Sequence, residues 1–207
     1  MTGTELQTPV FEFTGNRLCL DFSNTVHDRL TNPGELLNSY NDLLTWSQEA
    51  HILTGQETEA LREKARQNPQ AAAEVLARAI AVREAIYAIF SARAHGVMLA
   101  RNDLDRLNTE LMRANIQMCL VPEQDGFAWD WRGREQALDA MLWPVVRSAA
   151  DVLTSSELQD VRVCAADNCG WLFLDTSKNH SRRWCDMKSC GNRAKARKHY
   201  SQKKQTL

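Results

Sequence analysis

Apolar side chains recur at helical spacing along much of this chain of 207 residues. Between residues 69 and 94 they follow steps of three and four, which predicts the longest helix. Gly96 comes just after this segment and predicts a left-handed helix end, since glycine tolerates that backbone conformation. Four shorter helices are expected over 39–51, 56–67, 103–116 and 134–154.

Three local signals refine these helices. Thr54 and Glu57 form a capping box, in which each side chain satisfies a free N–H group at a helix start. Asn102 is of the type that caps a helix, and it precedes the segment that starts at 103. Pro144 lies inside the last predicted helix and is expected to kink it, because proline lacks the N–H donor.

Strand signals are fewer and shorter. Residues 118–121 and 127–131 are joined by the turn-rich segment 122–126, which predicts a hairpin. Weak alternation over 10–15 predicts one more strand, and two others are expected at 161–164 and 171–174. The predicted fold class is therefore mainly α with a few short strands.

The composition of the chain indicates the kind of protein and its cellular compartment. Hydrophobic residues make up 43% and charged residues 25% of the chain, which is typical of a soluble globular protein. No apolar run approaches the ~18 residues that a membrane span needs. The N-terminus lacks the basic and apolar segments of a secretory signal. We therefore expect a cytoplasmic protein with reduced thiols and no membrane partner.

Charge is distributed very unevenly. Residues 178–204 contain ten of the chain's 25 Lys and Arg but only one of its 26 acids. This end therefore carries +9, and the rest of the chain −10. Such an asymmetry indicates an anionic partner for the basic end. The alternative is a solvated tail without a partner.

Four cysteines precede and enter the basic stretch with the spacing C-x4-C, x15, C-x4-C. They are Cys164, Cys169, Cys185 and Cys190. In a reduced compartment, two cysteine pairs at this spacing predict a tetrahedral zinc site. Four thiolates leave no open position, so the single Zn²⁺ would be structural. Cys19 and Cys119 stand apart and are expected to be small core residues.

The order of elements around these cysteines predicts a treble-clef-like finger. A tight loop would carry the first pair, with Gly170 adopting the backbone angles that the loop requires. A helix from Gly191 to about Gln202 would follow Cys190, and its first turn would stabilise that thiolate. We expect two domains, a helix-rich body over residues 1–155 and the finger over residues 156–207.

The segment Arg183–Arg197 contains Cys190-Gly191-Asn192-Arg193 and resembles the CGNR zinc finger, named after that tetrapeptide. Residues 18–25 and 40–46 resemble the ABATE domain, which usually precedes this finger. The resemblance covers nearly the whole chain. It implies a stress-induced transcription regulator of bacteria. With the basic end beside the four cysteines, this favours a regulator whose finger holds DNA and whose body senses a small molecule or forms a homodimer.

The basic end supplies the candidate nucleic-acid contacts. They are Arg182, Arg183, Lys188, Arg193, Lys195, Arg197, Lys198 and Lys204. Cationic side chains of this kind bind phosphates, and each such bond adds to the salt dependence of binding. Asn192 is expected to cap or brace the zinc loop. Trp171 and Trp184 are expected in the core beside the zinc, with base stacking as the alternative.

Asp21 and Asn24 are polar residues set among apolar ones near the N-terminus. They would either line a pocket for a small polar molecule or cap a helix and bond internally. Trp46, Trp129, Trp131 and Trp143 are expected to be core residues. No Gly-rich phosphate loop, nucleophile elbow or H-E-x-x-H motif occurs, so we do not expect an enzyme.

Three functions remain open from the sequence. The first is a zinc-containing regulator that binds duplex DNA. The second is a protein that contacts RNA or the ribosome, since basic helices serve there too. The third is a ligand-binding protein or enzyme in which the zinc module is only a structural brace.

Overall fold

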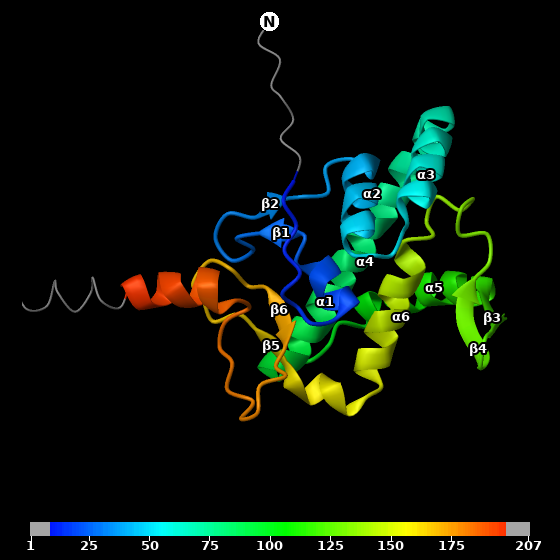
Figure 1. The fold of residues 1–207 in the computed structure, drawn as a ribbon. Coiled ribbons are helices and arrows are strands. Elements are labelled where there is room, and N and C mark those ends of the chain that lie inside the picture. Colours follow the sequence, from blue (N-terminus) through cyan, green and yellow to red (C-terminus); the bar gives the residue numbers. More distant parts are fainter. Residues whose placement is uncertain (1–8, 198–207) are drawn as a thin grey trace, which may run out of the picture.

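The computed structural model describes residues 9–197, and helices dominate it (Figure 1). We call residues 1–155 the body and residues 156–207 the finger. The body contains the helices α1 (Leu18–Ser23), α2 (Tyr40–Glu49), α3 (Gly55–Gln67), α4 (Pro69–His95), α5 (Arg101–Gln117) and α6 (Leu142–Leu153). Its antiparallel strand pairs are β1 (Val26–His27) with β2 (Gly34–Glu35), and β3 (Met118–Glu123) with β4 (Gly126–Trp131).

The long helix α4 is the centre of the body. It packs against α1, α2, α3 and α5, and α6 closes the core by packing on α1 and α5. Its buried residues Val82, Ile86 and Phe90 repeat every four positions, so they form one stripe that faces the core. Most of the expected helices are therefore confirmed, because their apolar stripes have a shared core to cover.

Several local predictions are confirmed. Thr54 and Glu57 form the capping box at the start of α3. Gly96 ends α4 with a φ of 67°, which is the left-handed region. The hairpin of β3 and β4 pairs Leu120 with Trp129, and its strands extend slightly further than expected.

Two predictions near helix ends are wrong. Helix α5 begins at Arg101 behind Ala100, which offers no capping side chain, so Asn102 lies inside the first turn. Residues 132–141 form turns, and α6 begins only at Leu142. Pro144 therefore lies in the first turn of α6, where backbone N–H groups have no partner within the helix and proline is tolerated.

The expected strand at residues 10–15 does not form, and the chain there is irregular. Phe11 is buried in the core, while Gly15 accepts a hydrogen bond from the Leu174 N–H at 2.8 Å. A single main-chain bond of this kind ties the segment to a neighbour without building a ladder.

The tryptophans divide between the core and the surface. Trp46 and Trp143 are buried, and Trp131 packs against the core from its edge. The expectation for Trp129 is wrong, because 66% of this residue is exposed. None of the helices within residues 9–197 has both the length and the apolar character of a bilayer-crossing segment.

The finger packs directly on the body. After the short 3-10 helix η1 (Ser156–Asp160), strands β5 (Val161–Val163) and β6 (Leu172–Leu174) form an antiparallel pair that contacts α1 and α4. Val161, Leu172 and Leu174 belong to the core of the body, whereas Phe173 between them packs with the cysteines. Because successive side chains of β6 point to opposite sides, this strand packs against the core of the body on one side and against the cysteine cluster on the other.

The last helix starts earlier than predicted. It opens with a single π turn, η2 (Met187–Gly191), and continues as α-helix through residues 192–197. Asp186 caps it by accepting a hydrogen bond from the Ser189 N–H at 2.7 Å. In Figure 1 this helix, coloured orange to red, extends away from the body.

Candidate metal centre and nucleic-acid interface

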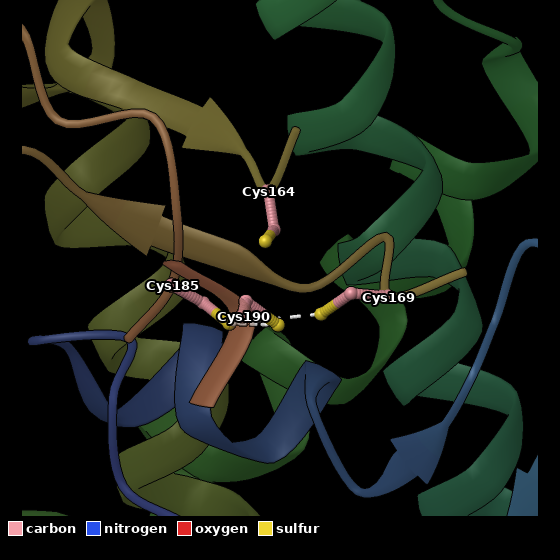
Figure 2. Close-up of side chains that lie close together, drawn as sticks. All are labelled: Cys164, Cys169, Cys185 and Cys190. Atoms are coloured by element: carbon pink, nitrogen blue, oxygen red, sulfur yellow. Dashed lines mark hydrogen bonds between the residues drawn. The ribbon is translucent and has the colours of Figure 1, made fainter. Parts of the chain in front are cut away.

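Four cysteine sulfurs converge in the finger (Figure 2). Cys164 follows β5 and Cys169 precedes β6, while Cys185 lies just before the last helix and Cys190 in its π turn. All four Sγ atoms lie within 4.8 Å of one another, and all four residues are buried. The Sγ atom of Cys185 lies 3.6 Å from that of Cys169 and 3.7 Å from that of Cys190.

These separations fit zinc. A tetrahedral Zn²⁺ with Zn–S bonds of about 2.3 Å places its sulfurs roughly 3.8 Å apart. The four cysteines therefore form a site for one zinc ion, as the sequence predicted. With four sulfur ligands the coordination shell is closed, and the ion serves to hold the fold.

The thiols strongly influence one another. Hydrogen bonds from the Cys169 and Cys185 thiols lower the pKa of Cys164. The same bonds with Cys164 raise the pKa of both partners. Without a cation the cluster therefore favours one thiolate over the others, whereas a divalent cation stabilises negative charge on all four.

The residues of the CGNR tetrapeptide serve the metal centre. Arg193 donates from Nη2 to the Cys190 sulfur at 3.2 Å, and this bond raises the pKa of the arginine. The Asn192 side chain donates to the Lys188 carbonyl at 3.0 Å and so braces the π turn that carries Cys190. Gly191 is buried in that turn. Arg193, predicted to contact nucleic acid, is thus engaged by the metal site.

A loop of the body clamps the first cysteine pair. The main-chain N–H groups of Arg29 and Leu30 donate to the carbonyls of Cys169 and Asn168, both at 3.2 Å. Gly170 has a φ of 70°, as predicted, and a Cβ there would lie only 3.0 Å from the Leu30 side chain. The zinc loop therefore needs glycine both for its backbone angle and for its close approach to the body.

Trp171 strengthens the same joint. It is buried, and its indole N–H donates to the Val26 carbonyl at 2.7 Å. His27 stacks on it with ring centroids 5.9 Å apart. Trp171 is therefore a core residue, as expected. Trp184 is half-buried and packs against the cysteine cluster from the other side.

Arg182, another predicted nucleic-acid residue, is a brace. Its guanidinium lies 4.5 Å from the centre of the Phe173 ring. It donates to the Trp184 carbonyl at 2.9 Å, to the Thr14 carbonyl at 3.2 Å and to the Cys185 carbonyl. Its charge thus binds the chain around the metal site to the N-terminal segment.

Asn24 joins the body to the finger. Its side chain donates to the Leu172 carbonyl and accepts from the Leu172 N–H, both at 2.9 Å. The amide of Asn24 therefore makes the two hydrogen bonds that a neighbouring strand would make to Leu172, and so satisfies main-chain groups that lie in the core. This is internal hydrogen bonding, and it engages both polar atoms of the side chain.

Asp21 is likewise turned toward the main chain. Its carboxylate accepts a hydrogen bond from the Gly15 N–H at 2.7 Å. Burial raises the pKa of Asp21 to about 6, although backbone hydrogen bonds from Gly15 and Thr14 oppose the shift. Asp21 and Asn24 thus lie at the joints between segments.

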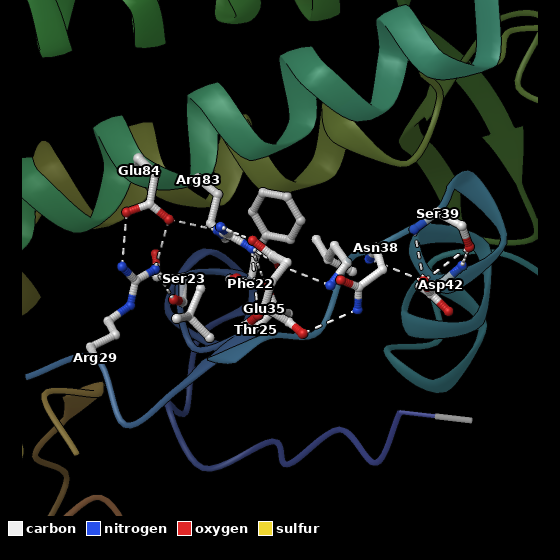
Figure 3. A network of polar contacts seen from close by, with 12 residues as sticks. Phe22, Ser23, Thr25, Arg29, Glu35, Asn38, Ser39, Asp42, Arg83 and Glu84 are labelled. Atoms are coloured by element: carbon white, nitrogen blue, oxygen red, sulfur yellow. Dashed lines mark hydrogen bonds and ion pairs between the residues drawn. The ribbon is translucent and has the colours of Figure 1, made fainter. Parts of the chain in front are cut away.

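A partly buried charge network, centred on Arg83, connects the Arg29–Leu30 loop to α4 (Figure 3). Arg83 of α4 pairs with Glu35 at 2.6 Å and with Glu84 at 2.8 Å, and only 2% of Arg83 is exposed. Glu84 in turn pairs with Arg29 at 2.8 Å, and the Arg29 guanidinium lies 4.0 Å from the Tyr87 ring centre. The clamp loop is therefore fixed to the central helix.

The remaining predicted cations face outward. Arg183, Lys188, Lys195 and Arg197 are exposed. Arg183 stacks 5.5 Å from the Trp184 ring centre, and Arg197 pairs with Asp167 at 3.3 Å. A surface hollow of about 430 Å³ lies among Trp184 and three of these cations. Lys198 and Lys204 lie outside the described residues.

Together, a helical body and a four-cysteine finger with exposed cations define a class of zinc-finger protein. Residues 16–156 match the ABATE family, described as a putative stress-induced transcription regulator. Residues 161–203 match the CGNR zinc finger. The chain belongs to the ABATE family and carries a CGNR finger. No curated protein matches it.

Sequence reasoning missed the clamp loop and the bracing roles of Arg182 and Arg193. The residues Asn32-Pro33-Gly34 are typical of a turn, which indicates a loop but not what the loop touches. One signal was available for Arg193, since a residue three positions after a helical ligand lies on the ligand's face.

Proposed function

We propose that this protein is a transcription regulator that binds duplex DNA through its finger, from a cytoplasmic location. One observation carries the proposal. The projecting end of the finger presents Arg183, Lys188, Lys195 and Arg197 to solvent beside a rigid metal centre. Exposed cations on a fixed scaffold bind phosphates at defined positions, which supplies affinity and orientation.

The proposal divides the predicted DNA-binding residues into two groups. Arg182 and Arg193 hold the metal loop, so their loss would act through the fold. Arg183, Lys195 and Arg197 border one hollow and would act on the phosphate backbone. Lys198 and Lys204 extend the basic stretch in the sequence.

DNA binding tests the proposal directly. Anisotropy titrations of labelled duplex DNA would compare the zinc-loaded protein with a variant that combines Arg183→Gln, Lys195→Gln and Arg197→Gln. We expect at least a tenfold weaker affinity at low salt. The slope of log K against log salt should also be smaller by roughly 0.9 for each phosphate that the variant no longer neutralises.

A matched control removes three cations from the body, by Arg93→Gln, Arg101→Gln and Arg106→Gln. These residues come from the end of α4 and the start of α5, and this variant should retain wild-type affinity. Equal weakening of DNA binding in the two variants would show that the loss depends on the net charge of the protein and not on the position of the cations. Negligible binding by the wild-type protein at low salt would refute the proposal.

The second candidate partner is structured RNA, which the same exposed cations would also attract. Competition between unlabelled duplex DNA and a structured RNA of equal length separates the two. We expect the duplex to compete more strongly. A role of the body in sensing a small molecule remains a prediction.

A further inference from the structure

The hairpin of β3 and β4 has an apolar face whose outer part is left exposed by the residues between 9 and 197. The register places Leu120 opposite Trp129 and Pro122 opposite Phe127, so these four side chains share a face. They are exposed, with 59% of Leu120, 78% of Phe127 and 66% of Trp129 open to solvent. Exposed apolar faces of this kind mark interaction sites more often than chance.

We propose that this face is the interface through which two copies of the chain form a symmetric dimer. The proposal does not depend on DNA binding. The proposed interface lies on the body. The sequence predicted a possible homodimer but did not indicate which surface would form it. The occupant is argued from area and from charge.

The exposed area agrees with a dimer. Large aromatic side chains offer roughly 150 to 250 Å² each, so the four-residue face presents on the order of 500 Å². A standard interface buries about 800 Å² per partner, and homodimer interfaces are about 65% apolar. The apolar face therefore supplies about the apolar share that one copy needs.

Charge selects the partner. The hairpin segment 118–131 contains three acids and no Lys or Arg, which disfavours a nucleic acid. Two of the acids, Glu123 and Asp125, lie at its tip. Arg132 follows the last strand at the base of the hairpin, is exposed, and forms no ion pair with any residue between 9 and 197. The tip of the hairpin is thus acidic, whereas its base carries the cation Arg132 as well as Asp130, which pairs with Arg134.

This polarity fixes the arrangement. If two hairpins pack face to face with their tips at opposite ends, each acidic tip lies near the Arg132 of the other copy. A tip-to-tip arrangement would instead bring four acids together. In a twofold dimer the pairing of an acidic tip with Arg132 of the other copy occurs twice, because symmetry repeats each contact.

Light scattering and sedimentation equilibrium of the full-length, zinc-loaded chain test the proposal. We expect a dimer for the wild type and a monomer for the variant that combines Phe127→Ser with Trp129→Ser. The matched control is Met98→Ser, which removes a side chain that is 95% exposed in the loop between α4 and α5 and should remain dimeric. Circular dichroism verifies that each variant stays helical.

A charge exchange separates self-association from any other partner. Arg132→Glu alone should weaken the dimer by about tenfold or more, since like charges then face each other. Adding Glu123→Lys and Asp125→Lys to the same chain should restore it, because both ends are exchanged. A wild type that stays monomeric at high protein concentration overturns the proposal. So does a dimer that survives the loss of both aromatic residues, or one that the charge exchange fails to restore.

Discussion

The body and the finger are held together by different means. The body buries a continuous apolar core around α4, whereas the separate buried cluster of the finger consists of four cysteines with Ala166, Trp171 and Phe173. So small a cluster cannot supply the hydrophobic stabilisation of a domain. The finger therefore depends on two supports outside its own apolar cluster, the metal and the body.

The largest expected effect is loss of the metal. Cys185→Ser should reduce the zinc content from one ion per chain to nearly none, and should destabilise the finger by on the order of 5 kcal/mol or more. Elemental analysis and thermal unfolding measure both, and we expect the helices of the body to remain. Cys119→Ser is the control, since this half-buried cysteine lies outside the cluster. Unchanged zinc content in the Cys185 variant would contradict the assignment.

The second prediction concerns the support from the body. Asn24→Ala should lower the free energy of unfolding by roughly 2 to 4 kcal/mol, because it leaves the N–H and carbonyl of Leu172 buried without partners. Urea unfolding measures the decrease. Asn41→Ala, at an exposed position in α2, should change stability by less than about 0.5 kcal/mol. Similar stability of the two variants would show that the joint contributes little.

The third prediction separates a cation that contacts the metal site from an exposed cation for which no such contact is seen. Arg193→Gln should make zinc about tenfold easier to remove with a chelator, because the arginine donates to the Cys190 thiolate. Lys195→Gln removes an exposed charge two positions away and should leave zinc retention unchanged. Equal zinc retention in the two variants would show that Arg193 does not stabilise the metal site, and Arg193 would again be a candidate DNA-binding residue.

The smallest expected effect is a pH dependence within the body. Burial raises the pKa of Asp21 to about 6 from an ordinary value near 3.8. The folded protein therefore binds more protons than the unfolded chain between these values, and stability falls as pH rises through this window. Asp21→Asn should remove that component and gain on the order of 1 kcal/mol near neutral pH, since weaker hydrogen bonds offset part of the relief.

Denaturation of wild type and Asp21→Asn at several pH values isolates this component, because the difference between them cancels contributions that both share. The difference should shrink as the pH falls below about 6. A constant difference across the window would show that Asp21 does not carry the burial penalty.

Most of the longer helices and the metal ligands could be predicted from the amino-acid sequence alone. Apolar periodicity around α4, the capping box at Thr54 and the spacing of the four cysteines are local patterns, and local geometry imposes them. The predicted helix starts near Asn102 and Pro144 were wrong, because where a helix begins there depends on how neighbouring turns pack.

The sequence could not show which charged and polar side chains hold the fold together and which are exposed. Arg182 and Arg183 are neighbours of the same type, yet one braces the metal loop and the other faces solvent. Asn24 is bound by a strand that follows it by almost 150 residues. A single sequence specifies which groups can donate and accept, but their partners come from distant segments, and only the folded chain brings these together.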